Sequence, residues 1–253
     1  MQEKAQSKIS DFATKDIVEN LANADETLTN EQCQSIINSA DPAALVSDLI
    51  LILQDEELAA IDAPGKGIVP INAVKLLKQL KPLEAIEPML QALVNSEYSD
   101  MIYSDIIFAL ADFGAPVLEP ALKAFVACVA QENEAQGGIA EILSRIGVKD
   151  ERIYSILIEM LEYDPELAAM LLQHYGDAAA LPHLSTALDL TKSGDKTRII
   201  ELVAAIEALG GTLTSRQQKL WERKGTGAKS GRGQKKSGGT IYQLGKPGVG
   251  IRF

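Results

Sequence analysis

A pattern of two helices and two breaks recurs about every 30 residues along most of the chain. Glu87-Pro88 recurs as Glu119-Pro120, and an amphipathic segment follows each dipeptide. Proline fits the first turn of a helix, where its missing N–H is not needed. Glycines end the preceding segments at spacings of 33, 29 and 34 residues: Gly114, Gly147, Gly176 and Gly210. A period near 30 with two helices per unit predicts a stack of helix pairs, in which each pair packs on its neighbours.

The spacing of apolar residues within these units predicts helices. From Ile86 onward, apolar residues fall at i, i+3, i+4, i+7 and i+8, and the segment from Ile153 repeats this spacing in full. The segments from Ile139 and Ile199 match its first four positions. Only a helix brings such positions to one face, and no comparable alternating run of β-branched residues occurs. We therefore expect an all-α chain with these residues in its core.

The N-terminal part of the chain is predicted to be helical but outside the repeat. Thr29 and Gln32 fit a capping box, in which a hydroxyl and an amide satisfy backbone N–H groups reciprocally. Asp41-Pro42 fits the start of the next helix, with the aspartate as its N-cap. The breakers in 62–67 predict a loop. We expect residues 1–66 to form a helical segment that packs on a repeat domain, residues 67–224.

Charge is distributed unevenly along the sequence. The net charge of −11 combines −20 before Arg216, from 14 Lys and Arg against 34 Asp and Glu, with +9 from Arg216 onward. Residues 225–253 contain nine glycines and no acidic residue, and too few apolar side chains to offset the entropy of ordering the segment. This composition predicts a flexible, basic, Gly-rich C-terminal tail. Such asymmetry is typical of an interaction segment attached to an oppositely charged body.

Four of the repeat units resemble HEAT repeats, particularly the short bacterial type of bilin-lyase-like and orphan HEAT proteins. The units are KPLEAIEPMLQAL, GAPVLEPALKAF, GVKDERIYSILIEML and GDAAALPHLSTAL. The resemblance implies a right-handed α-α superhelix, or solenoid, of antiparallel helix pairs whose second helices line a concave surface that usually holds a protein. The fourth unit is shortened, and the fifth departs from the pattern with Gly210-Gly211 and a polar, basic helix near 214–224. Fold does not imply function, so the resemblance names no partner.

The acidic surface predicts a non-enzymatic scaffold for a basic protein, because long-range attraction raises the encounter rate and selects partners by charge. The tail of the same chain is another expected occupant of that surface. The alternative is an RNA- or ribosome-associated protein that binds through the tail, with basic side chains for phosphate and a tyrosine for stacking. The predicted tail contacts are Lys229, Arg232, Lys235, Lys236 and Tyr242.

No catalytic, cofactor or metal site is predicted. Neither 225–230 nor 245–247 has the glycine, lysine and hydroxyl spacing of a phosphate-binding loop. His174 and His183 lack the His-Glu pairs with which HEAT-type deoxyhypusine hydroxylases hold iron. The acidic body also lacks the cationic face by which HEAT-like alkylpurine DNA glycosylases bind phosphate. A bilin-lyase-like enzyme is the least favoured alternative, since no pigment-contacting motif is identifiable.

The remaining features favour a cytoplasmic address. Cys33 and Cys128 lie among apolar residues of amphipathic segments, as expected of reduced core cysteines. No apolar run approaches the roughly 20 residues of a membrane span. The first residues, MQEKAQSKISDF, contain no apolar stretch of a secretion signal.

Overall fold

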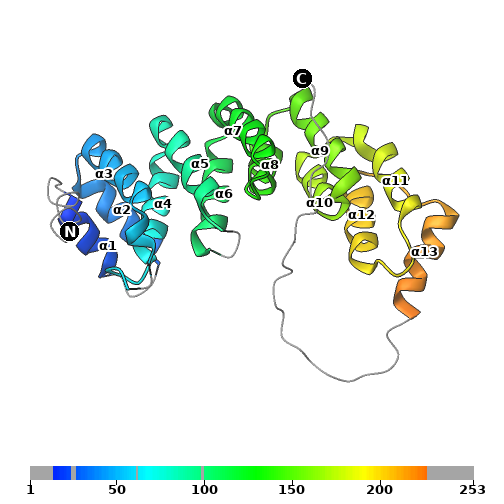
Figure 1. Cartoon of the computed structure of the whole chain (residues 1–253), viewed down its shortest axis with the longest axis horizontal. Coiled ribbons are helices and arrows are strands. Elements are labelled where there is room, and N and C mark those ends of the chain that lie inside the picture. The colour runs from blue at the N-terminus through cyan, green and yellow to red at the C-terminus, as the bar shows by residue number, and fades with distance from the viewer. Residues whose placement is uncertain (1–13, 24–26, 61, 98–99, 227–253) are drawn as a thin grey trace. The chain divides into compact units, whose positions relative to one another are not determined.

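The computed structural model describes residues 14–23, 27–60, 62–97 and 100–226, and every regular element within these ranges is helical. The predicted all-α class is confirmed. The chain divides into two compact units, residues 1–146 and residues 147–253, and each is described by itself (Figure 1).

The first unit consists of two layers of helices. Its α-helices are α1 (Thr14–Ala22), α2 (Asn30–Ser39), α3 (Pro42–Gln54), α4 (Ile68–Leu80), α5 (Ile86–Asn95), α6 (Met101–Phe113), α7 (Leu118–Ala130) and α8 (Gln136–Arg145). Short 3-10 turns precede three of them: η1 (Glu56–Ala59), η2 (Leu83–Ala85) and η3 (Ala115–Val117). α4, α6 and α8 pack side by side in one layer, and α3, α5 and α7 in the other. Contacts of α3 with α4, α5 with α6, and α7 with α8 join the layers.

The N-terminal helices are tied to the first layer through one buried amide. α1 and α2 both pack on α4. Asn72 of α4 is fully buried; its Oδ1 accepts from the Leu28 N–H at 2.9 Å and its Nδ2 donates to the Leu21 carbonyl at 3.2 Å. A buried amide satisfied in this way fixes the chain around it, since leaving either group unpaired costs about 1–3 kcal/mol.

The second unit repeats the same packing with fewer helices in its described part. Its elements are α9 (Glu151–Tyr163), α10 (Pro165–Tyr175), η4 (Ala178–Ala180), α11 (Leu181–Leu190), α12 (Lys196–Ala208) and α13 (Ser215–Thr226). α10 packs beside α12, and α9 beside α11, while α9 with α10 and α11 with α12 join these rows. α13 closes on α12 and extends to Thr226, two residues past residue 224, the predicted end of the repeat domain.

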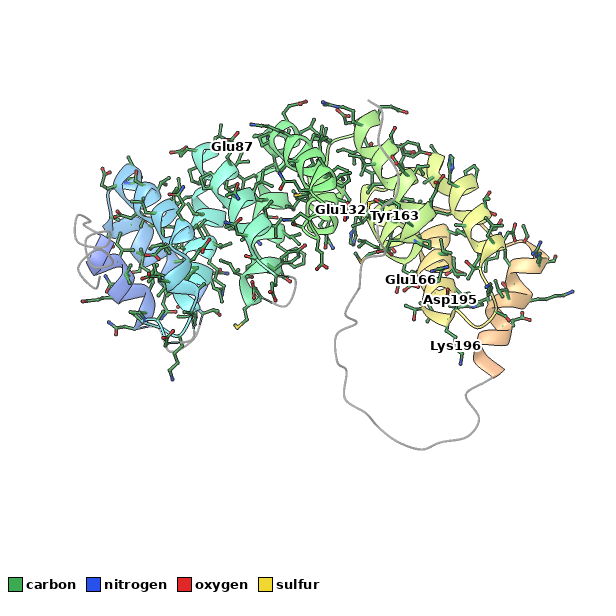
Figure 2. The ribbon with its side chains drawn as sticks, viewed as in Figure 1. Glu87, Glu132, Tyr163, Glu166, Asp195 and Lys196 are labelled. Carbon is green, nitrogen blue, oxygen red and sulfur yellow. The ribbon has the colours of Figure 1, made fainter. Side chains whose placement is uncertain are left out.

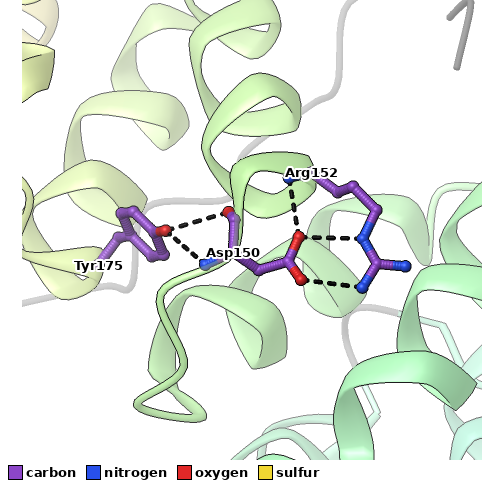
Figure 3. A network of polar contacts seen from close by, with 3 residues as sticks. All are labelled: Asp150, Arg152 and Tyr175. Carbon is purple, nitrogen blue, oxygen red and sulfur yellow. Dashed lines mark hydrogen bonds and ion pairs between the residues drawn. The ribbon is translucent and has the colours of Figure 1, made fainter.

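A polar network holds the start of α9 against the end of α10. Asp150 accepts from the Arg152 backbone N–H at 2.8 Å, and the Arg152 guanidinium returns to the same carboxylate at 2.8 Å (Figure 3). The Tyr175 hydroxyl accepts from the Asp150 N–H at 3.0 Å and donates to the Asp150 carbonyl at 3.1 Å. The arginine holds the pKa of Asp150 below its usual range, mainly by hydrogen bonding to the carboxylate. These contacts give Asp150, Arg152 and Tyr175 a structural role in joining the two helices.

The local sequence predictions for the described residues are largely confirmed. The apolar positions that begin at Ile86, Ile139, Ile153 and Ile199 are buried, except that Val94 and Leu161 are half-buried. The capping box of Thr29 with Gln32 is present, and Asp41 caps α3 by accepting from the Ala44 N–H at 2.9 Å.

The predicted helix breaks also have the expected backbone. The four glycines that end first helices all have positive φ, and Lys81 occupies the same slot in a left-handed conformation with φ 49°. That conformation normally favours glycine because it crowds Cβ against the backbone.

Among the described residues, no single helix has the length and apolar content of a membrane span. α6 and the η3–α7 segment reach that length only together, and they are bent by 114° at the break. Their large apolar side chains include Ile106, Leu110 and Phe125, which are buried between helices.

Candidate interaction site

Three loops of the first unit concentrate negative charge. They follow α3, α5 and α7 and connect each helix pair to the next; we call residues 55–67, 96–100 and 131–135 the acidic loops. Their acidic residues are Asp55, Glu56, Glu57, Asp62, Glu97, Asp100, Glu132 and Glu134. Lys66 is the one basic residue in these three ranges, and all of the carboxylates except Asp55 belong to exposed residues. The acidic loops thus carry a net charge of −7.

The position of several of these carboxylates opposes the helix dipole. The C-terminal end of a helix carries partial negative charge and favours cations by about 0.3–1 kcal/mol each. α3, α5 and α7 have no basic residue in their last turn. Instead Asp55 is the C-cap of α3, Glu97 follows the C-cap of α5, and Glu132 follows the C-cap of α7. Asp55 is also the N-cap of η1, where its carboxylate accepts from the Glu57 N–H at 3.0 Å. Helix stability does not explain the acidic residues at Glu97 and Glu132.

Ion pairing within the described part of the first unit does not neutralise them either. Its ion pairs include Lys78 with Asp112 at 3.1 Å and Arg145 with Glu141 at 2.9 Å, both away from the acidic loops. Among the described residues, no cation lies within ion-pair distance of Glu97, Glu132 or Glu134. Their field is therefore directed to solvent, where it attracts cationic groups over about a Debye length of 8–10 Å.

Two of the acidic loops form a cavity of about 430 Å³. Its polar wall contains Ser96, Glu97, Glu132, Asn133 and Glu134. Asn133 ties the 131–135 loop to the last turn of α5, because its Nδ2 donates to the Val94 carbonyl at 3.3 Å while its Oδ1 accepts from the Ala135 N–H at 2.8 Å. Glu132, labelled in Figure 2, has a left-handed backbone with φ 53°. The Asn133 N–H bonds back to the Cys128 carbonyl at 2.9 Å and closes the end of α7.

The inner wall of this cavity depends on a close approach between α6 and α8. Tyr103 lines the cavity and is 4% exposed. A Cβ placed on Gly138 would lie 2.4 Å from the Tyr103 hydroxyl and 3.1 Å from Cδ1 of Ile107. Only glycine at this position lets the two helices meet without displacing the tyrosine, so Gly138 sets the shape of the cavity.

The second unit also gathers carboxylates, but it pairs them. Arg198 of α12 lies between Asp195, at 3.3 Å, and Glu166, at 3.8 Å; Figure 2 labels both acids. Burial and the Asp195 carboxylate raise the pKa of Glu166, while Arg198 opposes the shift. Asp164 caps α10 by accepting from the Leu167 N–H at 3.1 Å. Burial, with Glu159 and Asp164 nearby, raises the pKa of Tyr163 to about 12, so the phenol stays protonated. The carboxylates of Asp164, Glu166 and Asp195 thus have structural partners.

The chain contains two cysteines and two histidines, and all four lie within the described residues. No group of three or more His, Cys, Asp or Glu side chains within them is arranged to hold a metal ion. Cys33 and Cys128 are buried and not in disulfides, and burial raises the pKa of both thiols, which opposes thiolate formation at neutral pH. His183 is exposed in the first turn of α11, and His174 is half-buried at the end of α10.

The predicted tail contacts lie outside the described residues: Lys229, Arg232, Lys235, Lys236 and Tyr242. In the sequence, the carboxylates of the acidic loops enter the prediction only as part of the acidic body. A stronger signal was available there, since the residues just after the second helix of successive repeats are acidic, at Glu97 and Glu132.

Comparisons of the chain with protein-family models, with curated proteins and with solved structures give no match.

Proposed function

We propose that this protein is a non-enzymatic binding scaffold, and that the acidic loops of its first unit bind a basic segment of a partner protein. One observation carries the proposal: Glu97, Glu132 and Glu134 surround a single cavity without a cation among the described residues. Lysine and arginine side chains of a partner would neutralise these carboxylates and the ends of α5 and α7 together.

The packing of the helices supports a finer proposal about architecture. In each unit, first helices pack beside first helices and second helices beside second helices, which is the arrangement of stacked helix pairs. We propose that these pairs form a right-handed HEAT-like superhelix with a Gly-rich basic tail, in a cytoplasmic protein. Stacked pairs present repeated loops in a row, so one partner segment can contact several acidic loops at once.

A peptide titration tests the function. The probe is a fluorescein-labelled 12-residue peptide of Lys, Gly and Leu, and its control has Glu in place of Lys. We expect the cationic peptide alone to bind the full chain, with affinity that falls as salt rises from about 0.05 M to 0.5 M because screening shortens the Debye length. The combined substitutions Glu97→Gln, Glu132→Gln and Glu134→Gln should weaken binding about tenfold, which corresponds to about 1.4 kcal/mol.

The matched control removes the same charge elsewhere in the first unit. Glu31, Glu84 and Glu87 are exposed and lie in the first turns of α2, η2 and α5. Changing these three to Gln should alter the affinity less than twofold. Equal losses in the two triple variants would mean that net charge, and not the acidic loops, attracts the peptide, and would contradict the proposal.

RNA binding through the tail is the second candidate function. It is favoured by the six Lys and Arg residues of 227–253, a segment without an acidic residue. A labelled single-stranded RNA of mixed sequence in the same titration separates the two functions. RNA binding that is unchanged by the Gln substitutions in the acidic loops would support the tail as an independent site.

A further inference from the structure

A second cavity, of about 440 Å³, lies within the second unit between the end of α11 and the start of α13. Its size falls in the range of roughly 300–1,000 Å³ that is typical of small-ligand sites. Its polar wall includes Asp189, Thr191, Ser215, Arg216 and Lys219. We call it the α11–α13 cavity.

The α13 side of this cavity is fixed by one buried glutamine. Gln217 lines the cavity and is 1% exposed. Its Nε2 donates to the carbonyl and to Oγ of Ser185 on α11, at 3.1 and 2.8 Å, and its Oε1 accepts from the Thr214 N–H at 2.9 Å. Thr214 Oγ1 accepts in turn from the Gln217 N–H at 3.3 Å. The first turn of α13 is therefore held against α11 before any ligand binds.

Two cationic side chains of α13 line the cavity. Arg216 and Lys219 are three residues apart, a spacing that places side chains on one face of a helix. Both are exposed, and neither forms an ion pair with any residue that the structure describes. Arg216 Nη2 donates to the Asp189 carbonyl at 3.3 Å, which links the guanidinium to the end of α11 but leaves its charge unneutralised.

The charge around the cavity is positive, in a chain whose net charge is −11. Segments 188–192 and 215–220 contain Lys192, Arg216 and Lys219 against one acidic residue, Asp189, a net charge of +2. The N-terminal end of α13 adds partial positive charge and N–H groups that have no acceptor within the helix. The cavity therefore favours an anion.

A phosphate group fits these donors better than a carboxylate does. Its tetrahedral oxygens can accept from Arg216, Lys219 and the Ser215 hydroxyl from different directions, whereas a planar carboxylate offers two oxygens. Arginine also pairs with phosphate through two parallel hydrogen bonds, and helix N-termini commonly bind phosphate.

The sequence around the cavity favours a ligand with many phosphate groups. From Arg216 onward the chain contains 10 Lys and Arg against one acidic residue, Glu222. A single phosphorylated side chain would use the cavity alone, whereas a nucleic acid strand carries a phosphate at every residue and matches a basic sequence that continues past the cavity. A single strand suits a cavity better than a duplex does, because its backbone is flexible.

The one carboxylate of the cavity favours RNA over DNA. Asp189 is half-buried in the cavity wall, and its carboxylate has no ion-pair partner among the described residues. A carboxylate beside a phosphate site opposes binding unless it accepts a hydrogen bond from the ligand. The ribose 2′-hydroxyl is such a donor, and DNA lacks it.

We propose that the α11–α13 cavity binds one phosphate group of single-stranded RNA, with Arg216, Lys219 and Ser215 as donors and Asp189 accepting from a ribose 2′-hydroxyl. The inference goes beyond the binding of a basic protein by the acidic loops and uses none of their residues. It gives the RNA alternative a preformed phosphate site on α13, separate from the predicted contacts in the tail.

Titrations of the full chain with a fluorescein-labelled single-stranded RNA of about ten nucleotides test the proposal. Arg216→Gln with Lys219→Gln should lower the affinity about tenfold. It should also reduce the slope of log K against log salt by about 1.4, because each phosphate contact contributes about 0.7 for single strands. The matched control is Lys66→Gln with Lys123→Gln, at exposed positions of the first unit, and it should change the affinity less than about twofold. Equal losses in the two pairs would mean that net charge or the tail alone attracts the RNA, and would overturn the proposal.

A second variant tests the choice of RNA. Asp189→Ala should lower the ratio of RNA to DNA affinity about threefold, measured with strands of the same sequence, because the carboxylate no longer discriminates through the 2′-hydroxyl. Glu207→Ala, at an exposed position of α12, removes the same charge and should leave the ratio unchanged. An unchanged ratio in Asp189→Ala would overturn the assignment of RNA.

Two further outcomes bear on the ligand and on the proposed function. A phosphoserine peptide that binds more tightly than the RNA, with the same dependence on Arg216 and Lys219, would assign the cavity to a phosphoprotein and overturn the proposal. The cationic peptide should bind the Arg216→Gln, Lys219→Gln variant as it binds the wild type, because the acidic loops are intact. RNA binding that depends on the cavity would therefore stand even if the cationic peptide failed to bind, and the reverse also holds.

Discussion

The two units differ in the charge of the loops that follow their second helices, although one position is alike: Asp55 after α3 caps η1 as Asp164 after α9 caps α10. In the first unit, the loops that follow α3, α5 and α7 carry carboxylates with no basic partner among the described residues. In the second unit, Asp164 after α9 caps the next helix, Lys192 follows α11, and Arg198 lies between Glu166 and Asp195. The whole-unit balance differs accordingly: residues 1–146 hold 9 Lys and Arg against 23 Asp and Glu, and residues 147–253 hold 15 against 12.

This difference separates charge that folding explains from charge that it does not. In the second unit, caps and ion pairs give most loop carboxylates a structural role. In the first unit, Asp55 caps η1 and Asp100 accepts from the Glu97 N–H, but no such partner is found for the carboxylates of Glu97, Glu132 and Glu134 among the described residues. Glu97 and Glu132 also oppose a helix dipole, so they weaken the fold slightly. Local features that break a stability rule without compensation are expected at functional sites. The contrast therefore supports the proposal that the first unit binds the partner.

The largest loss of stability is expected from a substitution at Gly138, where α6 and α8 pack closely beside the cavity of the first unit. Gly138→Ala places a methyl group against the Tyr103 hydroxyl. We expect the free energy of unfolding, measured by urea denaturation, to fall by about 1–3 kcal/mol because the helices must separate or the tyrosine must move. Gly194→Ala is the control, since Gly194 has no atom within 4 Å of an added Cβ. Equal stability of the two variants would show that the α6–α8 approach is looser than described.

A smaller loss is expected when the paired carboxylates of the second unit lose their cation. Arg198→Met leaves Glu166 and Asp195 facing each other, and we expect a loss of about 1 kcal/mol, limited by the partial exposure of these side chains. Lys192→Met, at an exposed position of the preceding loop, should change stability by less than about 0.5 kcal/mol. If both variants lose the same amount, Arg198 does not organise the cluster.

The pH dependence of stability in the second unit tests the comparison further. The pKa of Glu166 is raised by burial and by Asp195, so its contribution to stability is present at low pH and is lost as the pH rises through the folded-state pKa. Glu166→Gln, which is neutral throughout, should therefore be more stable than the wild type at pH 7, by less than about 1 kcal/mol. The difference should shrink as the pH falls below about 4.3, the ordinary range of glutamate. Thermal unfolding at pH 7 and pH 4 measures it, with Glu207→Gln, a substitution at an exposed position, as the control.

The smallest change in stability is expected when carboxylates of the acidic loops are neutralised. Glu97→Gln with Glu132→Gln and Glu134→Gln should raise the free energy of unfolding by about 0.3 kcal/mol, since two of the three charges oppose a helix dipole. Urea denaturation at low salt is the measurement. A loss above about 1 kcal/mol would mean that these carboxylates have a structural role, and the contrast between the units would fail.

Much of the local structure was predictable because it depends on nearest neighbours in the sequence. The i, i+3, i+4, i+7 spacing, the Asp41-Pro42 start and the Thr29–Gln32 box each act within one or two turns. Asn72 was not predictable, because its partners Leu21 and Leu28 lie more than 40 residues earlier. Gly138 was not predictable either. Glycine is usually unfavourable inside a helix, and the reason for it here is the contact with Tyr103 on another helix.

The candidate site was predictable only in outline. Net charge located an acidic body before Arg216, but it did not distinguish paired from unpaired carboxylates. Arg198 and Arg145 neutralise their neighbours through contacts between or along helices, and that information is three-dimensional. The division at residue 146 likewise depends on the density of tertiary contacts, and the predicted boundary near residue 66 stays a prediction.

Backbone amide NMR of the full ¹⁵N-labelled chain, titrated with the cationic peptide, measures the central claim most directly. We predict shift changes concentrated in residues 55–67, 96–100 and 131–135, reduced by salt and by the Gln substitutions at Glu97, Glu132 and Glu134. Changes concentrated around Glu166, Asp195 and Arg198 instead, or spread evenly over both units, would contradict the assignment of binding to the acidic loops.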